Sequence, residues 1–489
     1  MNGEAAMLDT TLLIGDDNRL ASDAATFERR NPLTGDVASR APAASVADAI
    51  AAAAAAAAAF PAWSVLGPSA RRAKLVQAAA LLEARVEDFV AAMADETGAT
   101  EGWARFNVAL AANMLREAGA ITTQVGGEVI PSDKPGLIAM AVRQPVGVVL
   151  GIAPWNAPVI LGVRAIAMPL ACGNTVVLKA SELCPATHGL IGEVLRDAGL
   201  DGGVVNVISN APADAARIVE ALIAHPVVRR VNFTGSTRVG RVVAEVAARH
   251  LTPALLELGG KAPFVVLDDA DLDEAVAAAA FGAFMNQGQI CMSTERIVVD
   301  GAVADLFAEK LARKAATLVA GDPRRAATPL GSVIGLDAVE RIDALVKDAV
   351  SRGARILAGG HARGTLMDAT VLDHVTPAMR IYGEESFGPV VSIVRVSGVE
   401  EAVRVANDTE YGLASAVFGR DVTRALQVAR RIEAGICHVN GPTVHDEAQM
   451  PFGGVKESGY GRFGGKAAIH EFTELRWITI ATGPGHFPI

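Results

Sequence analysis

Cysteine and net positive charge are scarce in this sequence. The four cysteines are too few to form a disulfide framework in 489 residues, and no two are spaced as C-x-x-C. The formal net charge of −10, with no Lys/Arg-dense run, argues against a nucleic-acid partner. The nine histidines lack zinc-ligand spacing, so no metal site is predicted.

Secretory and membrane-spanning segments are also missing. Residues 1–17 are acidic and lack the basic region and apolar core that a signal peptide requires. The alanine-rich run at 49–60 is too short and too weakly apolar to cross a bilayer. Together with the absence of disulfides, these features predict a soluble cytoplasmic protein that does not contact a membrane.

The chain is long and rich in apolar residues. It is 51% hydrophobic and 20% charged, which is typical of a well-buried globular protein and not of a disordered one. Because 489 residues are too many for one hydrophobic core, two or three substructures are expected.

The first segment is predicted to be helical. Ser45 and Asp48 form a capping box ahead of the alanine run. A second helix is expected at about 68–94, ended near Gly98, and a third at 103–118.

From residue 137 onward, β-type runs alternate with helices. Strands are predicted at 137–143, 146–152, 175–178, 204–208, 231–233 and 254–257, with helices at 185–197, 212–224 and 237–248. Strands joined by helices of this length form right-handed crossovers and a mostly parallel sheet. The fold class is therefore α/β, doubly wound and of the nucleotide-binding type. A second α/β series is expected from 261 to about 452.

The run at 472–480 reads as a strand with no local partner. With 137–143 it would form a protruding sheet that pairs between subunits, because an unpaired apolar edge invites aggregation.

The turn at 286–295 contains Cys291. It lies between an apolar helical run at 271–285 and a β-rich run at 296–299. Structural cysteines usually sit inside an apolar run, whereas a reactive one needs backbone donors and an access path. Cys291 is therefore the candidate nucleophile.

Two strand ends offer further polar groups. The turn from Phe233 to Gly240 places backbone N–H groups at a helix N-terminus, which suits a phosphate, but it lacks the middle glycine of G-x-G-x-x-G. A phosphate site and an ordinary βα turn both stay open. Glu257 occupies the place of a ribose-binding acid, yet the glycines after it equally suit a general base. General base and simple surface acid both stay open.

Two more motifs follow predicted strands. Asn156, between prolines, is either an oxyanion donor or a helix N-cap. Lys179 and Glu182 lie where parallel sheets bind ligands, and either hold ribose hydroxyls or form a solvated turn.

Six motifs, in this order, resemble those of the NAD(P)-dependent aldehyde dehydrogenase superfamily. They are Pro-Trp-Asn at 154–156, Lys-Ala-Ser-Glu at 179–182, Phe-Thr-Gly-Ser at 233–236, Glu-Leu-Gly-Gly-Lys at 257–261, Gly-Gln-Ile-Cys at 288–291 and Glu-Ser-Phe-Gly-Pro at 385–389. The likeness covers nearly the whole chain. Residues 155–185 and 285–299 look closest to the bacterial aromatic-aldehyde branch, which acts on salicylaldehyde, vanillin or benzaldehyde. The small Ala157 leaves room for a wide substrate.

The resemblance implies a division of the chain and an assembly. A Rossmann-type NAD-binding domain would comprise 1–125 and 146–257, and an α/β catalytic domain 258–460. A small β arm, 126–145 and 461–489, would join copies into a homodimer or a dimer of dimers.

The resemblance also implies a reaction. Cys291 would attack an aldehyde, Asn156 and the Cys291 N–H would stabilise the oxyanion, and Glu257 would activate first the thiol and then water. The product would be a carboxylic acid, formed through a Cys thiohemiacetal and a thioacyl-enzyme.

The cofactor implied is NAD, with NADP disfavoured because the Glu182 carboxylate repels a 2′-phosphate. The residues expected to bind it are Ile152, Pro154, Trp155, Lys179, Ser181, Glu182, Phe233, Gly235, Ser236, Gly240, Leu258, Glu385 and Phe387. Candidates for the substrate pocket are Trp103, Arg164, Ile290, Met292, Met450 and Phe452. Arg164 lies about two helical turns past Asn156 and either bonds a ring substituent or forms a structural salt bridge.

Alternative functions stay in view. A dehydrogenase of aliphatic aldehydes or semialdehydes would share every motif. A CoA-acylating dehydrogenase has no need of Glu257. A cysteine esterase would use Cys291 and Asn156 but leave the parallel sheet without a purpose. A binding protein on a retired enzyme scaffold would have no need to keep Cys291, Glu257 and Asn156 together.

Overall fold

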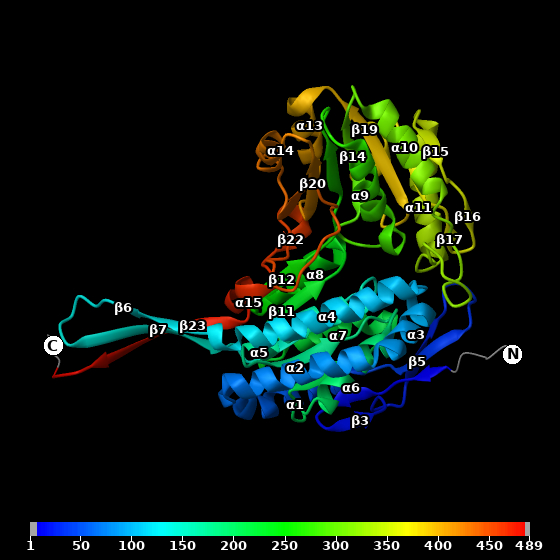
Figure 1. Ribbon diagram of the computed structural model, residues 1–489. Coiled ribbons are helices and arrows are strands. Elements are labelled where there is room, and N and C mark those ends of the chain that lie inside the picture. The colour runs from blue at the N-terminus through cyan, green and yellow to red at the C-terminus, as the bar shows by residue number, and fades with distance from the viewer. Residues whose placement is uncertain (1–6, 485–489) are drawn as a thin grey trace.

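The computed structural model describes residues 7–484, which form two α/β bodies and a projecting arm (Figure 1). The first body is built on an eight-stranded sheet in the order β22-β12-β11-β8-β9-β10-β2-β3. These strands are β2 (Leu12–Ile14), β3 (Asp17–Arg19), β8 (Val148–Ile152), β9 (Thr175–Lys179), β10 (Val205–Ile208), β11 (Val228–Thr234), β12 (Ala254–Glu257) and β22 (Gly459–Tyr460). The five central strands are parallel, so the predicted doubly wound sheet is confirmed.

Helices surround this sheet. They are α1 (Val46–Val65), α2 (Pro68–Ala84), α3 (Val86–Thr97), α4 (Glu101–Ile121), α5 (Pro158–Ala171), α6 (Pro185–Asp197), α7 (Ala215–Ala224) and α8 (Thr237–Arg249). The capping box of Ser45 and Asp48 at the start of α1 is present. The helices pack their apolar faces against the sheet, and these are the apolar positions that the sequence pattern predicted.

The second body contains a seven-stranded sheet in the order β15-β18-β19-β14-β13-β20-β21, parallel except for β15. Its strands are β13 (Ala262–Val266), β14 (Thr294–Asp300), β15 (Arg355–Ala358), β18 (Thr370–Asp373), β19 (Val390–Val396), β20 (Ala414–Phe418) and β21 (Ile436–Val439). Its helices are α9 (Leu272–Phe284), α10 (Ala304–Ala316), α11 (Leu336–Ser351), α12 (Arg380–Gly383), α13 (Gly398–Asn407) and α14 (Val422–Ala429). The loop from β12 to β13 connects the two sheets.

The arm consists of β6 (Gly127–Ile130), β7 (Leu137–Pro145) and β23 (Thr473–Ala481), and it projects beyond both bodies (Figure 1). β23 pairs antiparallel with β7 over its whole length, and α15 (Gly465–Glu471) leads into it. The predicted pairing of these two distant runs is confirmed. Its role between subunits stays a prediction.

Three expectations for the first segment were wrong. The helix predicted at 68–94 breaks at Arg85, which ends α2 and begins α3. No glycine or proline marks this break, at which Arg85 pairs with Asp88 of α3 and Glu193 of α6. The segment also opens with strands, including β1 (Leu8–Asp9), β4 (Thr26–Arg30) and β5 (Val37–Pro42), in addition to β2 and β3. Finally, α1 has 20 residues and is long and apolar enough to cross a membrane by length and composition alone. In the fold, the fully buried Ala49, Ala52, Ala53 and Ala56 form a face that packs within the first body.

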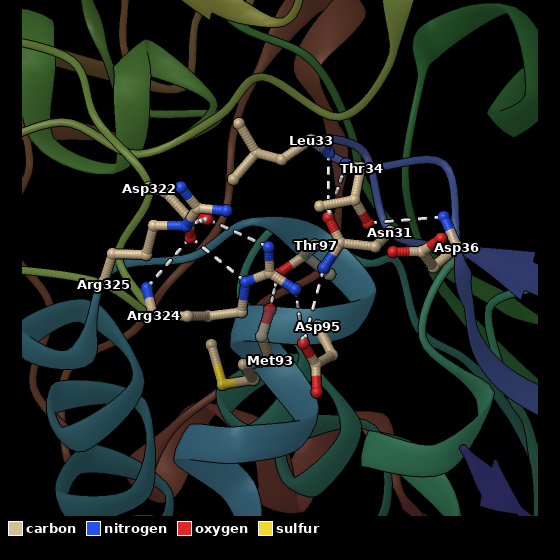
Figure 2. Close-up of polar contacts among 10 residues, drawn as sticks. All are labelled: Asn31, Leu33, Thr34, Asp36, Met93, Asp95, Thr97, Asp322, Arg324 and Arg325. Carbon is tan, nitrogen blue, oxygen red and sulfur yellow. Dashed lines mark hydrogen bonds and ion pairs between the residues drawn. The ribbon is translucent and has the colours of Figure 1, made fainter. Parts of the chain in front are cut away.

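The two bodies meet through polar contacts at the C-terminal end of α3 (Figure 2). Arg324, on a loop of the second body, pairs with Asp95 at 3.3 Å between Nη1 and Oδ1. Asn31 donates to the same carboxylate oxygen at 3.4 Å, and Asp322 holds the Arg324 guanidinium at 3.0 Å. Of these contacts, the Arg324–Asp95 pair links the second body to the first on this side of the molecule.

Candidate active site

The carboxyl ends of the central strands of the first sheet form one edge. Ile152 at the end of β8 is opposite Lys179 of β9 and Phe233 of β11, and Thr234 is opposite Glu257 of β12. The strands proceed outward from β8 in both directions, which creates a topological switch point, where such sheets bind ligands. The residues predicted to hold the cofactor therefore begin at the edge where sheets of this kind bind ligands.

The turn after β11 ends at the N-terminus of α8. Ser236 caps this helix, its Oγ accepting from the Val239 N–H at 3.4 Å. A Cβ on Gly240 would lie 2.4 Å from the end of the Leu258 side chain, so a larger residue here would displace Leu258. The helix dipole and the N–H groups near Gly235 give the edge the polarity that a pyrophosphate requires.

Lys179 and Glu182 form an ion pair at the end of β9. Asn210 donates to the same Glu182 oxygen at 3.1 Å, and Lys179 is only 5% exposed. Nearby, the Ser181 N–H donates to His188 Nδ1 at 3.0 Å. This arrangement is fixed by hydrogen bonds, and the solvated-turn interpretation is wrong.

The loop before Cys291 has an unusual backbone. The backbone has positive φ at Asn286, Gln287 and Gly288, with values of 47°, 55° and 68°. Residues other than glycine rarely adopt this conformation. Such strain persists only where surrounding contacts fix it. Gln287 supplies one of these contacts, donating to the Ser332 carbonyl at 2.9 Å. The loop is thus held against the second body in one conformation.

Asn156 lies against this loop. Its side-chain Nδ2 donates to the Gln289 carbonyl at 3.0 Å. Its main-chain carbonyl accepts from Trp103 Nε1 at 3.0 Å and from Asn286 Nδ2 at 2.9 Å. Helix α5 begins at Pro158 without a side-chain cap. The N-cap interpretation of Asn156 is therefore wrong, and its amide lies beside the Cys291 loop.

Glu257 is buried at 1% exposure, so the surface-acid interpretation is also wrong. Within residues 7–484 neither carboxylate oxygen has a hydrogen-bond partner. Burial raises the pKa of Glu257 to about 8, although the charge of Arg164 and the nearby Cys291 thiol oppose the rise. A carboxyl with this pKa gains and loses a proton near neutral pH, as a general base must.

Cys291 is partly exposed to the same space. Burial, and then the charge of Glu257, raises the pKa of the Cys291 thiol well above its usual range. The thiol is therefore protonated at neutral pH and needs a base to activate it. Glu257 is the carboxyl that lies near it.

A cavity of about 390 Å³ opens beside Cys291 and Asn156. Five of the six predicted pocket residues line it, namely Trp103, Arg164, Ile290, Met292 and Phe452. Ala157, Phe106 and Phe281 add to an apolar, partly aromatic wall. Met450 does not line this cavity. It is 46% exposed and borders a separate small hollow, so its placement in the pocket wall was wrong.

Arg164 forms the salt bridge that was one of the two roles suggested by its position. Its side chain is 6% exposed, forms an ion pair with Asp446 and lies over the Phe452 ring at 4.1 Å from the centroid. It also lines the cavity. The salt-bridge interpretation is confirmed, and a contact with a ring substituent stays a prediction.

A buried network connects the remaining motifs. Lys261 Nζ pairs with Glu295 Oε2 at 2.7 Å, and Glu295 Oε1 accepts from the Ser386 and Phe387 N–H groups at 2.9 and 3.0 Å. Just before Ser386, Glu385 accepts from the Gly260 N–H at 2.9 Å. This network orients the loop that carries Glu385.

The sequence suggested no role for Glu295 or Lys261, although Lys261 ends the Glu-Leu-Gly-Gly-Lys motif and Glu295 ends the turn at 286–295. The Phe387 ring meets the Trp155 ring edge to face at 5.8 Å between centroids, so the 385–387 loop also contacts the Pro154–Trp155 turn. A Cβ on Gly260 would lie 2.3 Å from the Cys291 carbonyl oxygen, which explains the glycine.

Removing the Lys261 charge should destabilise the protein strongly. The Lys261→Met variant leaves Glu295 charged and buried, a change that typically costs about 3–5 kcal/mol. The midpoint of unfolding in urea measures the loss. Lys310→Met is the matched control, because Lys310 pairs with an Asp273 that is 82% exposed, and such pairs contribute about 1 kcal/mol or less. Equal stability of the two variants would contradict the prediction.

Comparison with known proteins gives consistent matches. A model of the aldehyde dehydrogenase family matches residues 20–478. A vanillin dehydrogenase of Pseudomonas fluorescens is 65% identical over 483 residues, covering 99% of this chain and 100% of that protein. The crystal structure of a salicylaldehyde dehydrogenase from Pseudomonas putida G7, complexed with salicylaldehyde, has a TM-score of 0.97 at 50% identity and covers 99% of this chain and 100% of its own. The crystal structure of a betaine aldehyde dehydrogenase from Staphylococcus aureus in complex with NAD⁺ has a TM-score of 0.94 at 31% identity. The match covers 98% of this chain and 97% of that chain.

Proposed function

The chain belongs to the aldehyde dehydrogenase family, and from this premise we propose that it oxidises aromatic aldehydes to carboxylic acids with NAD⁺. The enzyme class and the use of a nicotinamide cofactor follow from the family. One observation carries the choice of substrate. The cavity beside Cys291 has an apolar wall with several aromatic rings, which fits a planar ring better than a charged or aliphatic chain.

The chemistry starts at Cys291. Glu257, whose oxygens have no other partner within residues 7–484, takes the thiol proton, directly or through water. The thiolate attacks the aldehyde carbon, and Asn156 Nδ2 with the Cys291 N–H stabilises the oxyanion. After oxidation, Glu257 removes a proton from water, which hydrolyses the thioacyl-enzyme. An esterase would not need the strand-edge residues of the first sheet.

The residues of the strand edge fit a dinucleotide. The bound nicotinamide would supply the hydride acceptor for the oxidation. Lys179 and Glu182 suit ribose hydroxyls, the N-terminus of α8 suits the pyrophosphate, and Glu385 suits the second ribose. Every side chain in this set has a hydrogen-bonding group that matches its partner.

Glu182 should make the enzyme prefer NAD⁺. Its carboxylate accepts from a 2′-hydroxyl but repels a 2′-phosphate, so the Glu182→Gln variant should narrow the gap in kcat/KM between NAD⁺ and NADP⁺ by roughly tenfold. Steady-state kinetics with each cofactor measures this. Glu193→Gln is the control and should leave the ratio unchanged, because Glu193 of α6 pairs with Arg85 and does not belong to the strand edge. A wild type that uses NADP⁺ equally well would contradict the role of Glu182.

The substrate class is tested by a panel of aromatic and aliphatic aldehydes, including semialdehydes, followed at 340 nm. A higher kcat/KM for the aromatic members supports the proposal. Preference for an aliphatic aldehyde would assign the enzyme to another branch of the family. No absorbance change with any aldehyde would refute the oxidation itself.

We also propose that the arm joins two copies of the chain. Leu475 and Trp477 on β23 and Val129 on β6 are 60%, 78% and 75% exposed, an unusual density of large apolar side chains at the edges of a small sheet. Light scattering of the wild type should give a dimer or a dimer of dimers. A monomer at micromolar concentration would refute this.

A further inference from the structure

The cavity beside Cys291 contains a buried carboxylate oxygen that has no donor. The Asp446 side chain is 8% exposed, and its Oδ2 accepts from Arg164 Nη2. Within residues 7–484, its Oδ1 has no hydrogen-bond partner. Asp446 and Arg164 both line the cavity that contains Cys291. A buried acceptor without a donor costs free energy, so a molecule that fills the cavity and brings a donor recovers that cost.

The surroundings define what kind of donor fits. Arg164 is held over the Phe452 ring, at 4.1 Å from the centroid, and its positive charge balances Asp446. A cationic donor would therefore be repelled by Arg164, whereas a neutral hydroxyl would not. Ile290 and Met292 contribute apolar wall on the Cys291 side. The cavity thus combines one acceptor with a surface suited to an aromatic ring.

The position along α5 indicates where on the ring the hydroxyl belongs. Asn156 lies just before α5, at the end near Cys291, and Arg164 lies six residues after Pro158, roughly 9 Å further along the helix axis. This spacing is on the scale of a substituted benzene ring. The donor is therefore expected on the part of the ring remote from the aldehyde.

We propose that Asp446 Oδ1 accepts a hydrogen bond from a ring hydroxyl meta or para to the aldehyde, which makes Asp446 a specificity-determining residue. The inference rests on the proposed function, since it requires an aromatic aldehyde at Cys291. Arg164 acts through Asp446, because its bond occupies Oδ2 and leaves Oδ1 without a donor within residues 7–484.

The experiment compares wild type with Asp446→Asn on hydroxy- and methoxybenzaldehydes substituted at the meta and para positions, and on benzaldehyde. Asparagine retains the shape and an oxygen for Arg164, but it presents an NH₂ donor in place of Oδ1. The preference for hydroxy over methoxy in kcat/KM should fall on the order of 10- to 100-fold, because a methoxy group only accepts. Benzaldehyde, which has no hydroxyl to donate, provides the baseline and should lose less kcat/KM than the hydroxybenzaldehydes.

The matched control is Asp373→Asn. Asp373 is also buried and paired with an arginine, Arg395, but it borders a different groove. This variant should leave the hydroxy-to-methoxy preference unchanged. If Asp446→Asn fails to fold, the wild type still tests the inference, because hydroxybenzaldehydes should exceed the similarly sized fluorobenzaldehydes in kcat/KM.

Two outcomes overturn the inference. One is a lack of the expected preference: either Asp446→Asn keeps the wild-type preference for hydroxy over methoxy, or the wild type shows no preference for hydroxy- over fluorobenzaldehydes in kcat/KM. The other is an equal loss on benzaldehyde, which would make Asp446 structural. Both differ from failure of the proposed function, in which the wild type would oxidise no aromatic aldehyde.

Discussion

Replacing Cys291 with serine should lower kcat/KM for aldehydes by about 10⁴-fold or more, the scale seen when a nucleophile is removed. An alcohol is far harder to deprotonate than a thiol, and burial already raises the pKa of the Cys291 thiol. Glu257, with a pKa raised to about 8, is too weak a base to produce an alkoxide. Production of NADH at 340 nm measures the loss.

Binding of NAD⁺ to the Cys291→Ser variant should change little, because the strand-edge residues are untouched. Cys437→Ser is the control, since Cys437 is also partly exposed but lies on β21, away from the cavity. It should retain nearly full activity. If the two variants lost activity equally, or if Cys291→Ser stayed active, Cys291 would not be the nucleophile.

The Glu257→Gln variant should lose about 10²- to 10⁴-fold in turnover, the usual contribution of a general base. Glu257 accepts a proton only when it is ionised. Since burial raises its pKa to about 8, the wild-type kcat/KM should fall about tenfold for each pH unit below that value. Above pH 8 the carboxylate is ionised, so kcat/KM stops rising with pH. The sloping part below pH 8 is the acid limb of the profile.

In Glu257→Gln this acid limb should disappear, because the amide does not titrate. Rapid mixing should also reveal a burst of NADH followed by slow turnover, since hydrolysis of the thioacyl-enzyme needs the base as well. Glu96→Gln is the matched control, because Glu96 is a buried carboxyl bonded to Ala186 and Thr187 at the start of α6. Persistence of the acid limb in Glu257→Gln would assign the titration to another group.

The sequence pattern predicted those features that depend on neighbouring residues. Parallel strands end at one edge, so Lys179 and Glu182 were expected from their positions where such sheets bind ligands. The roles of Cys291 and Asn156 were suggested by turns that contain glycine or proline. Local reasoning left Asn156 open between an oxyanion donor and an N-cap, because its partner Gln289 lies 133 residues away.

Distant partners account for the remaining misses. Asp446 carries no motif, and its pairing with Arg164, 282 residues earlier, exists only in the fold. Strand β2 was missed because its partner β10 is remote in the sequence and Leu13 pairs there with Val207. The break at Arg85 has no glycine or proline, and its partner Glu193 is more than 100 residues away, so local propensity does not report it.

The arm joins strands that are synthesised at different times. Arg143 of β7 bonds to Thr473 of β23, 330 residues later in the chain. At about 5–20 residues per second, the hairpin of β6 and β7 leaves the ribosome tens of seconds before its third strand exists. During that interval the edge of β7 is open to pairing with any other extended chain. Completion of β23 is therefore also the step that closes this route to misassembly.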